Sequence, residues 1–166
     1  MNIRYTAFAT LSLSALLAAG LAMADPLPPA NGISAASAIA LAEKETGARA
    51  TQLDVDDYRG KIAFDIELHD DKQEYDIRID AVTGDILSRK DEFDTDMPRP
   101  VQIALREAVK TAERETGGTA VDAELEGRHG VLVYEIKLVK PDGSRHYMDI
   151  DTADGKILAS GERHRH

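Results

Sequence analysis

The chain contains nearly the same nine-residue phrase twice. Residues 42–50 read AEKETGARA and residues 112–120 read AERETGGTA, which places Gly47 and Gly117 at a spacing of 70 positions. Repetition at a fixed offset is typical of a duplicated structural unit, because each copy of such a unit is one supersecondary element. The 166 residues are therefore expected to build one small unit twice.

Each copy starts with the pattern of an amphipathic helix. Apolar residues recur at i, i+3, i+4 and i+7 on one predicted face: Ala35, Ala38, Ile39 and Ala42 in the first copy, and Leu105, Ala108, Val109 and Ala112 in the second. Gly47 and Gly117 stand where the pattern ends, as expected of the left-handed residue that ends a helix. Pro100 is predicted to lie just inside the start of the second helix, where its missing N–H costs nothing.

After each helix the hydrophobic period changes from 3.6 to 2, which predicts strands with one wet face. The positions of this alternating pattern are Leu53, Val55, Ile62, Phe64, Ile66, Leu68, Tyr75, Ile77 and Ile79, then Leu125, Leu132, Tyr134, Ile136, Leu138, His146, Met148 and Ile150. One residue is inserted at the middle hairpin of the second copy, after which the offset is 71. The predicted fold class is α+β, with two repeats, each an N-terminal helix packed on a three-stranded antiparallel β-meander with a short final strand.

Both copies then carry a motif that resembles the PepSY domain. Residues 79–87 read IDAVTGDIL after Phe64-Asp65-Ile66, and residues 150–158 read IDTADGKIL after Tyr134-Glu135-Ile136. PepSY domains are small exported modules of metallopeptidase propeptides and of bacterial periplasmic and membrane proteins. The second copy departs from the usual Thr-Gly with Asp154-Gly155, which is still a turn dipeptide. The resemblance implies a binding or inhibitory module without chemistry of its own.

The N-terminus predicts export. An uncharged run from Ala7 to Leu21 follows Arg4 and leads to Ala22-Met23-Ala24, a pattern typical of a signal peptide cleaved after Ala24. The predicted layout is a signal peptide (1–24), an N-terminal linker (25–32), PepSY-like repeat 1 (33–90), a linker (91–99), repeat 2 (100–160) and a polar tail (161–166). We expect a periplasmic or secreted protein with no membrane span after signal removal; the oligomeric state stays open.

Composition excludes several classes of function. The formal net charge is −10, which argues against nucleic acid as a partner because its phosphates must be neutralised. The chain has no Cys, so disulfides, thiolate catalysis and Cys-ligated zinc are excluded. Hydrophobic residues make up 43% and aromatic residues 5%, which predicts a packed and mostly aliphatic core.

No metal or cofactor site is predicted. The segment Asp149–Gly155 hints at a calcium loop, but it has Ala153 at the fifth position and Ser160 where a bidentate Glu is needed. A hairpin turn explains the segment better, with Asp80 or Asp151 accepting from turn N–H groups. None of the five histidines (His69, His129, His146, His164 and His166) has a carboxylate or a second His at the helical spacing of a zinc site.

No catalytic residue is predicted either. Ser144 and His146 are two apart, so they would share one face of a strand, but no oxyanion donors or nucleophile elbow accompany them. Separately, Val131, Val133 and Val139 place apolar side chains on the predicted wet face. Either the other repeat covers them, which we favour, or a partner does.

Two hypotheses on function follow. The first is a non-enzymatic periplasmic binding or inhibitory module that acts on a peptidase or another envelope protein. The alternative is an acidic envelope protein that binds divalent cations or basic peptides at low affinity.

Overall fold

The computed structural model describes residues 25–93 and 100–162. The predicted signal peptide, the second part of the predicted linker and the histidines of the tail lie outside the described residues.

The described elements follow one another in the same order twice. They are α1 (Ala35–Thr46), β1 (Arg49–Tyr58), β2 (Lys61–His69), β3 (Gln73–Asp80) and β4 (Ile86–Phe93), then α2 (Leu105–Thr116), β5 (Thr119–Arg128), β6 (Val131–Val139), β7 (Arg145–Asp151) and β8 (Ile157–Gly161). The predicted α+β class and the duplication are confirmed. Strand β4 is longer than the short strand expected and runs through Phe93, into the segment 91–99 that was predicted as a linker.

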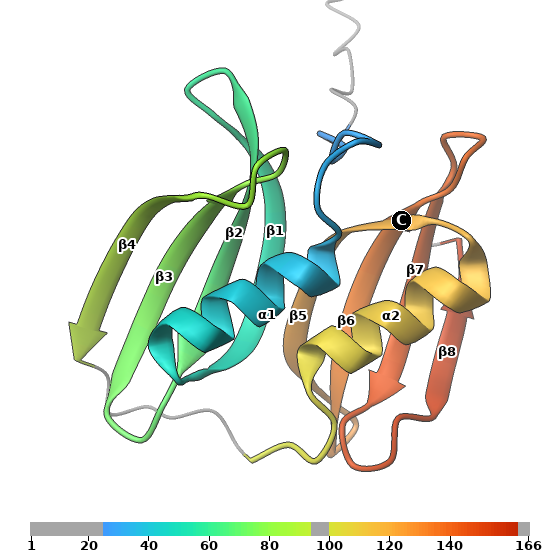
Figure 1. Ribbon diagram of the computed structural model, residues 1–166. Coiled ribbons are helices and arrows are strands. Elements are labelled where there is room, and N and C mark those ends of the chain that lie inside the picture. The colour runs from blue at the N-terminus through green and yellow to red at the C-terminus, as the bar shows by residue number, and fades with distance from the viewer. Residues whose placement is uncertain (1–24, 94–99, 163–166) are drawn as a thin grey trace, which may run out of the picture.

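All eight strands form one antiparallel sheet in the order β4-β3-β2-β1-β5-β6-β7-β8. Both helices lie on the same face of that sheet (Figure 1). The repeats meet where β1 pairs with β5, with Leu53 opposite Ala123, its own equivalent at offset 70. The two units are therefore related by a local two-fold axis that passes through this pair.

The repeated phrase encodes the end of each helix. Gly47 and Gly117 have φ of 75° and 67°, a left-handed conformation that other residues adopt only with strain. Thr116 Oγ1 donates to the carbonyl of Ala112 at 2.8 Å and accepts from Gly118 N–H at 3.1 Å. Thr46 makes the same two bonds in repeat 1. The Glu-Thr-Gly core thus ends the helix and turns the chain into the first strand.

The prediction that Pro100 lies inside the second helix was wrong. Helix α2 begins at Leu105, with Ala104 as its N-cap. The N–H groups of Gln102 and Ile103 both donate to the carbonyl of Thr152, so this backbone is fixed against the end of β7 before the helix starts. A helical conformation at Pro100 would give up these two bonds.

The core lies between the helices and the sheet and is mostly aliphatic, as predicted. Its largest residues occupy equivalent positions in the two repeats, Phe64 in β2 and Tyr134 in β6, and both are fully buried. The Tyr134 hydroxyl donates to the carbonyl of Ile103 at 3.1 Å, and burial raises the pKa of Tyr134 to about 12. A single cluster of buried residues includes both helices and strands of both repeats.

The two PepSY-like motifs form matching turns. Asp80 Oδ1 accepts from the N–H of Val82 at 2.8 Å, and Asp151 Oδ1 accepts from Ala153 at the same distance. The glycine that ends each turn has a positive φ of 78° at Gly84 and 76° at Gly155. The expectation that these aspartates hold a turn is confirmed.

Candidate functional site

The face of the sheet opposite the helices carries many charged side chains. Side chains alternate along each strand, so residues next to the core positions point away from the helices. Carboxylates of this face lie on the central strands and on β3, among them Asp54, Asp65, Glu67, Asp76, Asp122 and Glu124. No described helix or strand covers them. We call this surface the acidic face.

The acidic face is hollowed over repeat 1. A shallow cavity of about 520 Å³ is lined by residues of β1 to β4, among them Asp54, Asp65, Glu67 and Asp76. Arg78 also lines it and donates two hydrogen bonds to the carboxylate of Asp65. Arg89 and Lys90 line it as well, so four carboxylates face three basic side chains and only a small excess of negative charge remains.

Like charges meet where the repeats join. Asp54 lies directly opposite Asp122 in the β1–β5 pairing. Burial raises the pKa of both carboxyl groups, and the negative charge of Asp54 adds to the rise at Asp122. Ionised carboxylates directly opposite each other oppose the pairing of their strands. A bound cation or basic side chain would relieve this cost.

The prediction that the other repeat covers the apolar residues of β6 was wrong. The repeats join edge to edge in one sheet, so neither repeat lies on the other's outer face. Val133 is nevertheless buried, because it lies between Glu126 and Asp151 on its neighbouring strands. Val131 is exposed and Val139 is half-buried.

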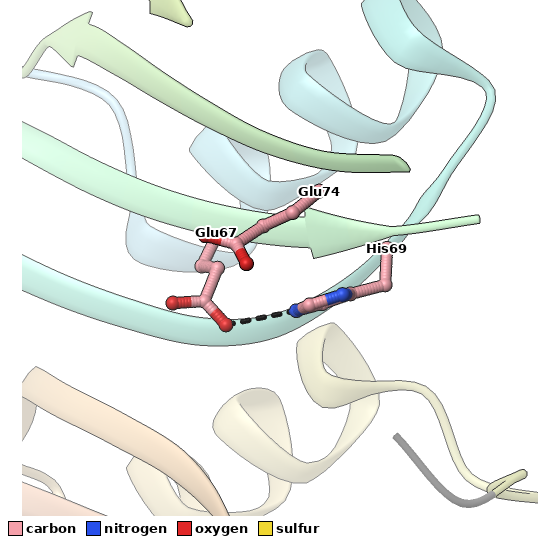
Figure 2. Close-up of side chains that lie close together, drawn as sticks. All are labelled: Glu67, His69 and Glu74. Carbon is pink, nitrogen blue, oxygen red and sulfur yellow. Dashed lines mark hydrogen bonds and ion pairs between the residues drawn. The ribbon is translucent and has the colours of Figure 1, made fainter. Parts of the chain in front are cut away.

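Three side chains of types that can ligate a metal converge at one corner of the acidic face (Figure 2). Glu67, His69 and Glu74 each place one ligand atom so that all three atoms lie within 4.8 Å of one another. Glu67 and His69 are two apart on β2, and Glu74 is opposite His69 on β3. His69 Nε2 is 2.9 Å from Glu67 Oε1. We call these residues the Glu-His-Glu cluster.

Sequence reasoning missed the Glu-His-Glu cluster because histidines were tested at helical spacing only. His69 is the last residue of β2 and does not lie on a helix. On a strand the relevant spacing is i, i+2, and Glu67-x-His69 has it. That spacing, with Glu74 just past the hairpin, could have found the cluster.

The equivalent corner of repeat 2 has the opposite charge. Lys137, Val139 and Arg145 replace Glu67, His69 and Glu74 at offsets of 70 and 71. Asp25, from the segment before α1, lies between the two bases, with its oxygens 2.7 Å from Lys137 Nζ and 2.7 Å from Arg145 Nε. Partial burial raises the pKa of Asp25, but the hydrogen bonds from the two bases outweigh burial and hold that pKa below its ordinary value.

A larger groove lies at the hairpin end of repeat 1. Its volume is about 1080 Å³, and it is lined by the turn after α1 and the start of β1, the β2–β3 hairpin and the segment Pro100–Gln102. Arg49 crosses it to donate to the carbonyl of Val101 at 3.0 Å. His69 lies at its border, so the groove adjoins the Glu-His-Glu cluster.

The other candidates from the sequence do not come together as sites. Ser144 bonds to Asp142 through both its N–H and its hydroxyl, while His146 Nε2 lies 2.8 Å from Ser160 Oγ. Ser144 and His146 therefore bond to different residues, Asp142 and Ser160, and not to each other. His129 lies in the β5–β6 turn with φ of 49°.

The two edges of the sheet differ in chemistry. Strand β4 has four consecutive charged residues, Arg89, Lys90, Asp91 and Glu92, which discourage pairing with another chain. Strand β8 has the uncharged sequence ILASG, and four of its five residues are exposed. Among the described strands, none pairs with the outer edge of β8.

The motif turns and the duplicated fold agree with a comparison against known families. The model of the family described as "Peptidase propeptide and YPEB domain", PepSY, matches residues 32–90 and again residues 102–160. The chain belongs to the PepSY family. The family is a non-catalytic module and its members are typically exported.

Two curated relatives come from Bacillus subtilis strain 168. The chain is 28% identical to the uncharacterized protein YkoJ over 123 residues, which is 72% of this chain and 68% of YkoJ. It is 33% identical to the uncharacterized membrane protein YkoI over 88 residues, which is 53% of this chain and 38% of YkoI. The described residues of this chain include no helix that is long and apolar enough to span a membrane.

A solved structure shares the fold. The crystal structure of a candidate lipoprotein from Clostridium difficile 630 superposes with a TM-score of 0.50 at 20% identity, covering 84% of this chain and 99% of the other. At this identity the likeness extends to the fold alone.

Proposed function

We propose that the protein is a non-enzymatic binding module of the bacterial periplasm that holds an extended segment of another envelope protein, in the first place a peptidase, and inhibits it. The observation that carries the proposal is the outer edge of β8, which is uncharged and exposed. An exposed antiparallel edge accepts an extended segment through main-chain hydrogen bonds without demanding one particular sequence.

The partner segment is expected to be basic. The acidic face continues up to β7, where Asp149 lies beside Ala159 of β8. An extended segment added to β8 would point every second side chain toward that face. Opposite charge on the two surfaces speeds association, most strongly at low salt.

Membership of the PepSY family supports a peptidase as the first partner to test. The family's description includes peptidase propeptides, which act by binding the enzyme. The alternative function, weak binding of divalent cations or basic peptides by the acidic face, is supported by the carboxylates of Asp54 and Asp122, which lie directly opposite each other at the β1–β5 join.

The test combines capture with a matched pair of variants. The exported protein is immobilised, partners are captured from the envelope fraction at low and physiological salt, and captured peptidases are assayed with and without added protein. Ala159→Lys should weaken the binding of a basic segment at least tenfold, whereas Ala159→Glu should preserve it. Both substitutions lie at an exposed edge, so unfolding curves should stay close to that of the parent protein.

Equal capture by the two Ala159 variants would contradict docking at β8. Recovery of no specific polypeptide at either salt concentration would contradict the proposed function as a whole.

A further inference from the structure

We propose that Glu67, His69 and Glu74 form a binding site for one divalent transition-metal ion, for which zinc is the probe. Their ligand atoms already lie within 4.8 Å of one another. Zinc holds imidazole and carboxylate ligands at about 2.0–2.2 Å, which places neighbouring ligand atoms roughly 3.3 Å apart. We expect rotation of the two Glu side chains to close this difference.

The cluster is built on rigid elements. Glu67 and His69 share one face of β2, and His69 is paired with Glu74 across the β2–β3 ladder, next to the hairpin. The His69 side chain is only 9% exposed, so packing limits the positions of its ring. Its Nδ1 is buried and has no hydrogen-bond partner among the described residues. A site whose ligands stand on paired strands needs little reorganisation to bind an ion.

In the second repeat, the equivalent corner holds a counter-ion between β6 and β7. Lys137 and Arg145 occupy the positions of Glu67 and Glu74, and the carboxylate of Asp25 bridges them at 2.7 Å on each side. Repeat 1 has two carboxylates at the same two positions. The geometry that seats an anion in repeat 2 therefore suits a cation in repeat 1.

The donor set selects the kind of cation. Ca²⁺ and Mg²⁺ prefer sites made of oxygen ligands, whereas an imidazole with carboxylates suits zinc and neighbouring transition metals. Three protein ligands leave the fourth position of a tetrahedral ion open to water or to a ligand from a partner. The site is independent of docking at β8, because it lies in the other repeat.

The experiment is a calorimetric titration with zinc at about pH 7.5, where imidazole is largely deprotonated and free to bind a metal. The starting protein carries His164→Ala and His166→Ala, so that the tail histidines cannot contribute. We expect one zinc ion per chain. His69→Ala should weaken binding at least tenfold, and Glu74→Gln should weaken it about tenfold.

Two controls separate this site from nonspecific binding. His146→Ala removes a histidine that bonds to Ser160, far along the sequence from the cluster, and should leave zinc affinity unchanged. Calcium in tenfold excess should not displace zinc. The visible spectrum of bound cobalt, used in place of zinc, should change with His69→Ala because an imidazole nitrogen leaves the coordination shell.

The proposal is overturned if the starting protein binds no stoichiometric zinc, or if His69→Ala and His146→Ala bind it equally. Should His69→Ala fail to fold, Glu74→Gln decides, because that carboxylate is only half-buried and its substitution keeps the size of the side chain. Unchanged zinc affinity in a folded Glu74→Gln variant would also overturn the proposed three-ligand site.

Discussion

At the scale of single residues, the ends of the two helices depend on backbone conformation more than on contacts. A Cβ added to Gly117 would meet no atom within 4 Å, yet the residue has φ of 67°. Gly117→Ala should therefore lower the free energy of unfolding by about 1–2 kcal/mol through strain alone. Gly161→Ala is the matched control, since that position also has open space but no positive φ. Urea titrations that give equal losses for both would contradict the account.

A second prediction at the residue scale concerns pH and the join between the repeats. Burial raises the pKa of Asp54 above its ordinary value of 3.8, so the folded protein binds this proton more tightly than the unfolded chain does. The resulting stabilisation is complete below the pKa that Asp54 has in the unfolded chain. It is lost as the pH rises through the pKa that Asp54 has in the folded protein. At neutral pH the ionised carboxylate therefore opposes folding.

Asp54→Asn should remove this cost, because the amide oxygen can still accept from Val55 N–H, as Asp54 does at 2.9 Å. We expect the variant to gain about 0.5–1 kcal/mol of stability at pH 7, the range of a like-charge pair across strands. The gain should shrink as the pH falls toward about 4. A gain that is independent of pH in denaturant titrations would show that the charge is not the cause.

At the scale of elements, α2 is held by its buried face. Leu105 begins the helix and is fully buried against the sheet, so Leu105→Ala should cost about 2–4 kcal/mol. The next residue, Arg106, donates to Glu43 of α1 at 3.1 Å, with 42% of its side chain exposed. Arg106→Ala should cost under about 1 kcal/mol. Equal losses in a denaturant titration would mean that the helix face is wrongly assigned.

The sequence predicts these elements well because each carries a local signal. The 3.6-residue and 2-residue periods locate α1, α2 and the core positions of the strands. Gly47 marks a helix end because glycine adopts the left-handed conformation without strain. The features that the sequence did not predict depend on contacts between residues far apart in the chain. The start of α2 is set by bonds from Gln102 and Ile103 to Thr152, and the bridge from Asp25 joins segments more than a hundred positions apart. The Glu-His-Glu cluster does have a local signal, the i, i+2 spacing of Glu67 and His69 on a strand. It was missed because the histidines were compared with the spacing of a helix.

At the scale of the whole molecule, the two repeats form one folding unit. Their strands pair at the β1–β5 join, their helices contact each other, and one buried cluster extends through both. Leu53 and Ala123, which face each other at the join, are fully buried. Separating the repeats would expose both residues, together with one unpaired strand edge in each half. Each half would then present an unpaired strand edge to which a strand of another chain could pair.

The two halves should differ in their tendency to dimerise. The local two-fold symmetry would allow the unpaired β1 or β5 strand of a fragment to pair with the same strand of a second copy. In a pair of β1 strands with the native register, Gln52 would face Asp54 and Leu53 would face Leu53, which brings no like charges together. In a pair of β5 strands, Asp122 would face Glu124 twice, and like charges directly opposite are destabilising. A fragment of residues 29–93 should therefore dimerise with rising concentration in sedimentation experiments, while a fragment of residues 100–162 should not associate at neutral pH. Lowering the pH toward about 4 should allow the second fragment to dimerise as its carboxylates take up protons. Equal association of the two fragments at neutral pH would show that the charges at the join do not decide which edge can pair.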